Sequence, residues 1–189
     1  MVPQDLHIHS RYSTGDSSVV EQQTIALIAA VKHARSIGIS DHFDYVCDEA
    51  VFHTYKNEIR SHGLKVGVEV DGSRWVERAS VVDCDYYVYH CRDSGEEYRG
   101  LETLVETGKP VITAHPFILG TDLKKVPPES FIEINNRYIW RCDWRTLLPP
   151  LVSHRRFVIS SDAHQPNWLN QNVARYVCRE VGIEETILF

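Results

Sequence analysis

Two short motifs, one near each end of the chain, have the spacing of paired metal ligands. His7 and His9 are separated by one residue, and so are Asp162 and His164. In an extended segment the side chains at i and i+2 point to the same side, so both members of a pair can face one ion. Imidazole and carboxylate groups bind zinc, iron and manganese. The two pairs therefore predict a divalent metal site built from both ends of the chain.

Four further residues of ligand type lie between these pairs: His42, Glu69, His90 and His115. With the two pairs they make eight candidates, which is more than one tetrahedral ion accepts. A carboxylate can also bridge two ions, because it has two oxygens. The set predicts two or three divalent ions, and its chemistry leaves zinc, manganese and iron open.

The segments that must position these residues alternate between strand-like and helix-like patterns. Short runs rich in Val, Ile, Tyr and Phe predict seven strands, at 5–9, 37–41, 66–70, 86–90, 111–115, 131–135 and 157–161. Helical patterns lie between them at 19–34, 50–62, 75–82, 96–107, 144–154 and 167–181. Such alternation is typical of an α/β fold with a parallel sheet. We expect a single domain over residues 1–189, because the chain is long enough for one sizeable core.

Several of these predicted helices have recognisable ends. Ser18 and Ser94 are each followed three residues later by a glutamate, which is the spacing of a capping box at a helix start. Gly63, Gly108 and Gly182 stand where a helix should end, and glycine tolerates the left-handed conformation that closes many helices. Residues 120–130 have no period and are expected to form a loop.

Six of the seven predicted strands end in, or run directly into, a candidate ligand. The strand at 131–135 does not, because Asn135 and Asn136 stand at its end. In a parallel barrel all strands point the same way, so residues at their C-terminal ends converge on one face. Ligands that are far apart in the sequence can therefore form one site.

Four segments carry most of these ligands: Asp5-Leu6-His7-Ile8-His9-Ser10, Gly38-Ile39-Ser40-Asp41-His42, Ala114-His115-Pro116 and Ser161-Asp162-Ala163-His164. Together they resemble the four motifs of the polymerase and histidinol phosphatase family, the PHP domain. The resemblance covers essentially the whole chain. It implies a distorted seven-stranded (β/α) barrel of TIM-like form and a metal-dependent phosphoesterase with a trinuclear site.

The resemblance also divides the ligands among three ions. The first ion would be held by His7, His9, Glu69 and Asp162. The second would be held by Glu69, His90 and His115. The third would take His42, His164 and a residue of the loop after the first strand. Part of the family has a histidine in that loop, and this chain has Thr14-Gly15-Asp16. Asp16 is the expected substitute, although aspartate is also a common turn residue.

The expected activity is hydrolysis of a small phosphate ester, such as histidinol phosphate or a nucleotide monophosphate. A hydroxide that bridges two ions would attack phosphorus, because bound metal lowers the pKa of water. Asp162 and His164 are the expected catalytic residues, with His164 as a proton donor to the leaving alkoxide. Arg11 and Arg92 each follow a ligand by two residues and are the expected phosphate-binding residues. Further basic candidates are Lys124, Lys125, Arg137 and Arg141.

Composition limits the partners of this site. The chain has 26 acidic and 20 basic residues, and a net charge of -6 disfavours extended binding to nucleic acid or to an anionic membrane. The longest apolar run, 25–31, is too short to span a bilayer, and the N-terminus has no signal-like pattern, so we expect a cytoplasmic protein. Five cysteines without a Cys-x-x-Cys pair predict neither disulfides nor a thiolate zinc site. The oligomeric state stays open.

Two other functions remain compatible with the sequence. Metal-dependent amidohydrolases and deaminases also use a His-x-His motif after a first barrel strand, although they commonly need eight strands. A non-catalytic metal-binding PHP module is the alternative outside enzymes. The remaining histidines lie in or beside predicted helices without a paired ligand, and we expect them at the surface; they are His33, His53, His62 and His154.

Overall fold

The computed structural model describes residues 1–189 and contains one sheet of seven parallel strands, ordered as in the sequence. The strands are β1 Val2–Asp5, β2 Ala34–Ile39, β3 Lys65–Asp71, β4 Tyr86–His90, β5 Val111–Thr113, β6 Phe131–Asn135 and β7 Phe157–Ser160. Every neighbouring pair is parallel. Six of the predicted strands are therefore present, the first strand lies earlier than predicted and shares only Asp5 with the predicted range, and the alternation of strands with helices is confirmed.

The sheet nearly closes into a barrel, because the segments after β1 and β7 meet. The backbone N–H of Asp162 donates to the carbonyl of His7 at 2.9 Å, and that of His9 donates to the carbonyl of Ala163 at 3.0 Å. A parallel bridge joins Ile8 to Ala163. The first strand ends at Asp5 rather than at His9, so the His-x-His pair lies just beyond it, in the segment that completes the barrel.

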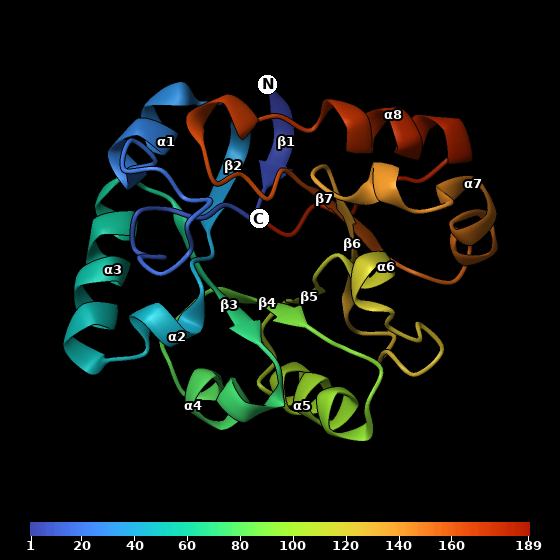
Figure 1. Cartoon of the computed structure of the whole chain (residues 1–189), viewed down its shortest axis with the longest axis horizontal. Helices are drawn as coiled ribbons and strands as arrows, with labels where there is room; N and C mark the ends of the chain where they lie inside the picture. Colours follow the sequence, from blue (N-terminus) through green and yellow to red (C-terminus); the bar gives the residue numbers. More distant parts are fainter.

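Helices cover the outside of the sheet, with α1 and α3 on one side, α4 and α5 on another and α7 and α8 on a third (Figure 1). They are α1 Ile25–Val31, α2 Phe43–Val46, α3 Glu49–Ser61, α4 Val76–Ser80, α5 Gly95–Glu106, α6 Pro116–Leu119, α7 Trp144–Leu147 and α8 Asn172–Val181. Four 3-10 turns complete the set: η1 Ser73–Trp75, η2 Ile139–Arg141, η3 Pro149–Leu151 and η4 Pro166–Trp168. None of the helices has the length and apolar character needed to cross a membrane.

The predicted helix at 19–34 is wrong over most of its length. α1 begins only after Thr24, whose hydroxyl accepts the backbone N–H of Leu27 at the helix start. Ser18 does not cap a helix, because its N–H and hydroxyl both donate to Asp16. The Ser94 cap is confirmed, since its hydroxyl accepts from the N–H of Glu97 at the start of α5. Capping-box spacing thus identified one of two helix starts.

Prolines explain two further differences. The predicted helix at 144–154 is split into α7 and η3, where Pro149 and Pro150 cannot donate the helical hydrogen bonds. The predicted helix at 167–181 begins later, as α8, because Pro166 starts a separate turn, η4. Gly182 does end α8 in the left-handed conformation, with φ of 74°.

The barrel interior is filled by a small apolar cluster below the predicted ligands. Its members come from the strands or from the residue directly after a strand and are Leu6, Tyr86, Val88, Ile112, Ala114, Phe131 and Val158. Alternation along β4 places Tyr86, Val88 and His90 on the same side. The Tyr86 side chain fills the space over Gly38 and Gly67, so that a Cβ atom at either position would clash with it. An apolar floor therefore lies beneath the ligands.

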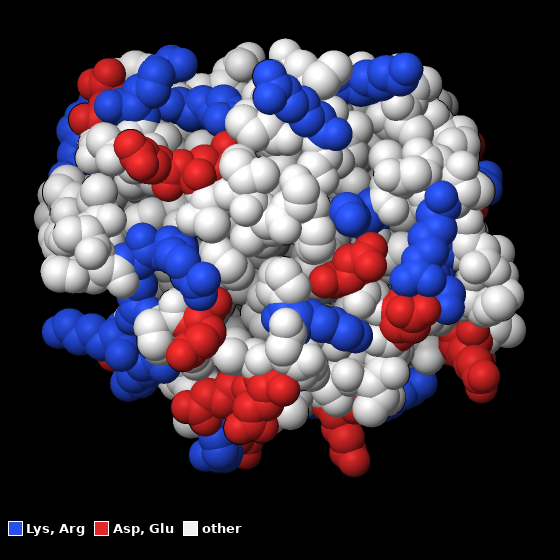
Figure 2. All heavy atoms as spheres, turned by 180° about the vertical axis from the view of Figure 1, so that it is seen from behind, with Lys and Arg blue, Asp and Glu red and all other residues white.

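Charges of both signs are interspersed on the molecular face seen from behind (Figure 2). Lys and Arg side chains lie beside Asp and Glu side chains there, and no field of one sign covers that face. This agrees with the modest net charge of -6. Attraction of an anionic ligand must therefore be local.

Candidate metal centre

The eight predicted ligands meet at the C-terminal ends of the strands. Ligand atoms lie within 4.8 Å of one another in each of four groups of three residues. These groups are His7 with His9 and Glu69; Glu69 with His90 and His115; His7 with His115 and Asp162; and His9 with His42 and His164. Buried His, Asp and Glu groups that can hold metal ions are therefore present where the sequence predicted them.

Glu69 lies at the centre of the cluster. Its Oε1 is 3.0 Å from Nε2 of His7 and 2.5 Å from Nε2 of His90. Its Oε2 is 2.8 Å from Nδ1 of His42 and 3.4 Å from Nε2 of His9. Burial by itself raises the pKa of Glu69, but the surrounding histidines, His90 first, lower it well below its usual value. The carboxylate is thus ionised, and its two oxygens face different groups of histidines.

Carboxylates hold the far side of two of the histidine rings, one of them buried (Glu133) and one partly exposed (Asp71). Nδ1 of His7 donates to Oε1 of Glu133 at 2.7 Å, and Nδ1 of His90 donates to Oδ1 of Asp71 at 3.1 Å. Burial raises the pKa of Glu133, but His7 lowers it to about 2. Partners of this kind fix the ring orientation and direct Nε2 toward a metal. His7 and His90 are therefore oriented before any ion binds.

A serine and an aspartate orient His9 in the same way. The Ser13 hydroxyl donates to Asp41 at 2.6 Å and lies 3.4 Å from Nδ1 of His9. The N–H and hydroxyl of Ser10 also donate to Asp41. Burial raises the pKa of Asp41 to about 6, although these hydrogen bonds oppose it. The loop after β1 is thereby tied to the end of β2.

The facing ring nitrogens fit a bound cation. Nε2 of His7 is 3.2 Å from Nε2 of His9, and Nε2 of His90 is 3.1 Å from Nε2 of His115. Two ring nitrogens this close repel unless a proton or a metal ion lies between them. Burial lowers the pKa of His9, as does the His164 ring, so His9 presents a lone pair. Burial also acts to lower the pKa of His7, but Glu133 and other carboxylates raise it well above normal. A divalent ion bound between the facing nitrogens would remove their repulsion.

Asp16 closes the cluster at its rim. Its Oδ2 is 3.0 Å from Nε2 of His164 and 3.3 Å from Nε2 of His42, while its Oδ1 accepts two hydrogen bonds from Ser18. Burial raises the pKa of Asp16, but the Ser18 hydrogen bonds lower it to about 2. Burial lowers the pKa of His42, but Glu69 raises it to about 9. Asp16 therefore occupies both places predicted for it, beside the two histidines and in a turn.

Two candidate ligands have an unusual backbone conformation. Asp162 has φ of 54° and His115 has φ of 25°. Residues other than glycine rarely adopt positive φ, and such conformations concentrate at functional sites. The surrounding barrel holds both residues there, since the N–H of Asp162 donates to the carbonyl of His7 and the N–H of His115 donates to Glu133. Backbone strain thus marks the same site as the side chains.

Arg137 is the arginine in contact with the cluster. Its Nη1 lies 3.2 Å from Nε2 of His164 and 3.7 Å from Oδ1 of Asp162. The sequence included Arg137 among four unranked basic residues. A guanidinium at this position is suited to an anion held at the ligands.

The two arginines that the sequence favoured lie farther out. Arg11 points to Glu58 on α3, with 3.9 Å between Nη2 and Oε1, and 56% of its side chain is exposed. Arg92 pairs with Asp71 at 2.9 Å and is also exposed. It therefore contacts the carboxylate that holds His90, while Arg11 makes no ion pair with the cluster.

Sequence reasoning missed the supporting carboxylates. Glu133 is fully buried, accepts hydrogen bonds from His7, the N–H of His115 and the amide of Asn135, and stands in the one strand that lacked a ligand. A signal was present in the sequence, because a glutamate interrupts the apolar pattern of β6 two residues before Asn135. Alternation puts both on the inner side of the barrel.

The remaining histidines and cysteines have structural or surface roles. His53, His62 and His154 are exposed as predicted. The surface prediction is wrong for His33, whose side chain is 9% exposed and whose Nε2 lies 2.9 Å from Oδ2 of Asp5. The five cysteines are free in this structure.

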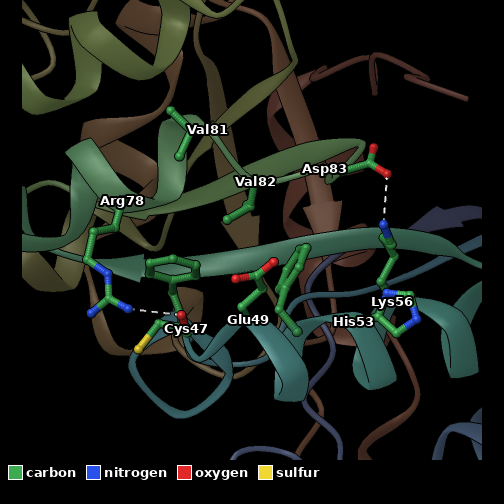
Figure 3. Close-up of a pocket in the computed structure, with 10 residues that line it drawn as sticks. Cys47, Glu49, His53, Lys56, Arg78, Val81, Val82 and Asp83 are labelled. Carbon is green, nitrogen blue, oxygen red and sulfur yellow. Dashed lines mark hydrogen bonds and ion pairs between the residues drawn. The ribbon is translucent and has the colours of Figure 1, made fainter.

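A separate surface cleft of about 480 Å³ lies between α3 and the segment that follows α4 (Figure 3). Lys56 pairs with Asp83 at its edge, and Arg78 donates to the carbonyl of Cys47. The residues that line it include none of the candidate ligands. The cleft is therefore not part of the metal centre.

No protein-family model matches the chain, and no curated protein matches it. The resemblance to the PHP motifs therefore stays a prediction. Function is therefore inferred from the chemistry of the site itself.

Proposed function

We propose that this protein is a metal-dependent phosphoesterase that hydrolyses a small phosphate ester. The observation that carries the proposal is the contact between Arg137 and two members of a buried cluster of metal-type ligands, His164 and Asp162. The cluster suits cations, and the guanidinium beside it suits the oxygens of a phosphate. The PHP-like motifs, with the distorted seven-stranded (β/α) barrel of TIM-like form that they imply, favour the same chemistry.

The cluster offers donors for two or three ions of zinc, manganese or iron. We assign to the first ion His7, His9, Glu69 and Asp162. We assign to the second Glu69, His90 and His115. We assign to the third His42, His164 and Asp16. When bound, the ions supply Lewis acidity toward phosphoryl oxygens and lower the pKa of water to near neutrality.

The protein's own groups bind and orient. Glu133 and Asp71 hold the Nδ1 protons of two histidines, so that both rings present Nε2 to the cluster. Arg137 binds phosphate oxygens at the solvent-facing side of the cluster. His164 is a poor proton donor at neutral pH, because burial, helped by the Arg137 charge, lowers its pKa. We therefore assign to His164 a role as ligand and orienting group. Water from the solvent then protonates the leaving group.

The test is a substrate panel on protein reconstituted separately with zinc, manganese and iron(II). The expected result is release of inorganic phosphate from at least one monoester, loss of that activity on chelation and its return with metal. His9→Ala should abolish turnover, while His53→Ala, which changes an exposed histidine of α3, should not.

Two results would overturn the proposal. Turnover of amides or lactones without phosphate esters would indicate an amidohydrolase. Stoichiometric metal binding without turnover of any ester would indicate a non-catalytic metal-binding module. Elemental analysis of the same preparations separates this second case from a simple failure to load metal.

A further inference from the structure

Three aromatic rings and two guanidinium groups alternate in a row beside the metal centre. Their order is Trp168, Arg137, Tyr138, Arg141 and Trp140. The guanidinium carbon of Arg137 lies 5.1 Å from the Trp168 ring centroid and 5.0 Å from that of Tyr138. That of Arg141 lies 5.2 Å from the centroids of Tyr138 and Trp140. We call these five residues the aromatic–arginine row.

One end of the row touches the candidate ligands. Arg137 contacts His164, as described above, and the Trp168 ring lies 6.0 Å from the His164 ring. The Tyr138 ring meets His115 edge-on at 5.2 Å. The row therefore begins at the metal centre.

The other end reaches solvent and is held in place. Trp140 is 61% exposed, whereas Trp168, Arg137 and Tyr138 are partly buried. The indole Nε1 of Trp140 donates to the carbonyl of Arg137 at 2.8 Å, and the neighbouring Ile139 anchors η2 in the core. A large ring that is fixed yet exposed can stack on a ligand with little loss of conformational entropy.

We propose that the aromatic–arginine row binds a nucleotide, with the phosphate ester at the metal centre and the base stacked on Trp140. The inference rests on the proposed phosphoesterase function. Nucleobases stack on aromatic side chains, and guanidinium groups stack on rings while also pairing with phosphate oxygens. An ester with a cationic far end, such as histidinol phosphate, would instead meet the charges of Arg137 and Arg141. The net charge of -6 favours a free nucleotide over a long nucleic acid.

The test compares adenosine 5′-monophosphate with ribose 5-phosphate on metal-loaded protein. The two esters share the sugar and the phosphate, so their difference in kcat/KM reports the base. We expect a preference of roughly tenfold or more for the nucleotide, the size of one base stacked on an aromatic ring. Trp140→Ala should remove most of this preference, and Trp140→Phe should keep part of it.

Arg145→Ala is the matched control, because it removes another arginine–tryptophan pair, with Arg145 4.0 Å from the Trp144 centroid, outside the row. It should keep the full preference. Equal kcat/KM for both esters in the wild type, or a preference that survives in Trp140→Ala, would overturn this inference and leave the phosphoesterase proposal standing.

Absence of turnover on both esters would count against the proposed function and leave the row to be tested by binding. Calorimetric titration with adenosine, which has the ring and no phosphate, provides that test. Binding to the wild type that weakens about tenfold in Trp140→Ala supports the row as a base site. Equal binding by both proteins, or no binding to the wild type, overturns it.

Discussion

His7 and His42 both face Glu69, yet their surroundings differ. The His7 side chain is fully buried, and its other ring nitrogen is held by Glu133, which is also fully buried in the wall of the barrel. The His42 side chain is 20% exposed, and its other nitrogen faces Asp16, 21% exposed, in the loop after β1. The inner ligands are thus positioned by strands, and the rim ligands are positioned partly by a surface loop.

This difference predicts how tightly each site binds its metal ion. A buried carboxylate behind a histidine keeps the ring in a fixed orientation, and loss of such a partner typically weakens metal binding 10–100-fold. A loop carboxylate that water can reach offers weaker orientation, because solvent competes for its oxygens. We therefore expect the site of His7, His9, Glu69 and Asp162 to retain metal when the rim site, with His42, His164 and Asp16, exchanges it.

The substitution with the largest expected effect on the inner site is Asp162→Ala. Oδ1 of Asp162 lies 3.8 Å from Nε2 of His7 and 3.6 Å from Nε2 of His9. We expect phosphate release to fall by more than about a hundredfold, because removal of a ligand should exceed the loss caused by removal of an outer partner. Asp162→Asn separates the effect of losing the carboxylate charge from any effect on backbone conformation, since asparagine also tolerates the positive φ at this position. A variant that loses metal by elemental analysis yet keeps the full rate would contradict the proposed function.

The pH dependence of stability tests the charges of the whole cluster in protein stripped of metal. Two groups act beside those named next: burial lowers the pKa of His90 but Glu69 raises it to about 10, and the pKa of Asp16 is lowered to about 2. At the rim, the pKa of His42 is raised from 6.5 to about 9, mainly by Glu69 against the effect of burial. A histidine whose pKa is raised on folding stabilises the folded state fully below about pH 6.5. That stabilisation is lost as the pH rises through 9. In the interior, the pKa of Glu133 is lowered from 4.5 to about 2, mainly by His7 against burial. Its contribution is present above about pH 4.5 and is lost as the pH falls toward 2.

Metal-free protein should therefore be most stable between about pH 4.5 and 6.5. We expect its free energy of unfolding, from urea denaturation, to fall by roughly 2–3 kcal/mol between pH 6 and 10. Metal-loaded protein should keep its stability over the alkaline part of this range, because ions replace the protons on the histidines. Equal stability of the metal-free protein at pH 6 and pH 10 would rule out the charged state assigned to His42.

Glu133→Gln sharpens the comparison without removing a ligand. The amide keeps the size of the side chain but replaces the carboxylate that accepts from Nδ1 of His7. We expect inner metal affinity to fall about 10–100-fold, with the fold retained by circular dichroism. Glu129→Gln, an exposed change shortly before β6, is the matched control. Unchanged metal affinity in Glu133→Gln would mean that the barrel wall alone orients His7.

The sequence predicted the seven strands and the ligand set because period-2 alternation and strand ends are local properties. It did not reveal Glu133 as a partner of His7, because that contact joins β6 to the segment after β1 across the barrel. The helix predicted at 19–34 failed for a related reason. Its first residues are held by tertiary bonds, such as that from the N–H of Val20 to the carbonyl of His164, which no local pattern encodes. Arg137 could be singled out from the other basic candidates only from the structure, because the fold of the barrel brings it beside His164.

Asp16→Asn is the mildest test, aimed at the rim alone. Asparagine can still accept from Ser18 and preserve the turn, while the charge facing His42 and His164 is lost. We expect one metal equivalent to be lost on dialysis and kcat to fall by about tenfold or less, since the inner ligands stay intact. Asp44→Asn, at the start of α2 and two residues after His42, provides a control that removes the same charge from a residue outside the cluster. If Asp16→Asn instead lost all its metal, the rim would be an integral part of one cooperative site, and the distinction between strand-held and loop-held ligands would fail.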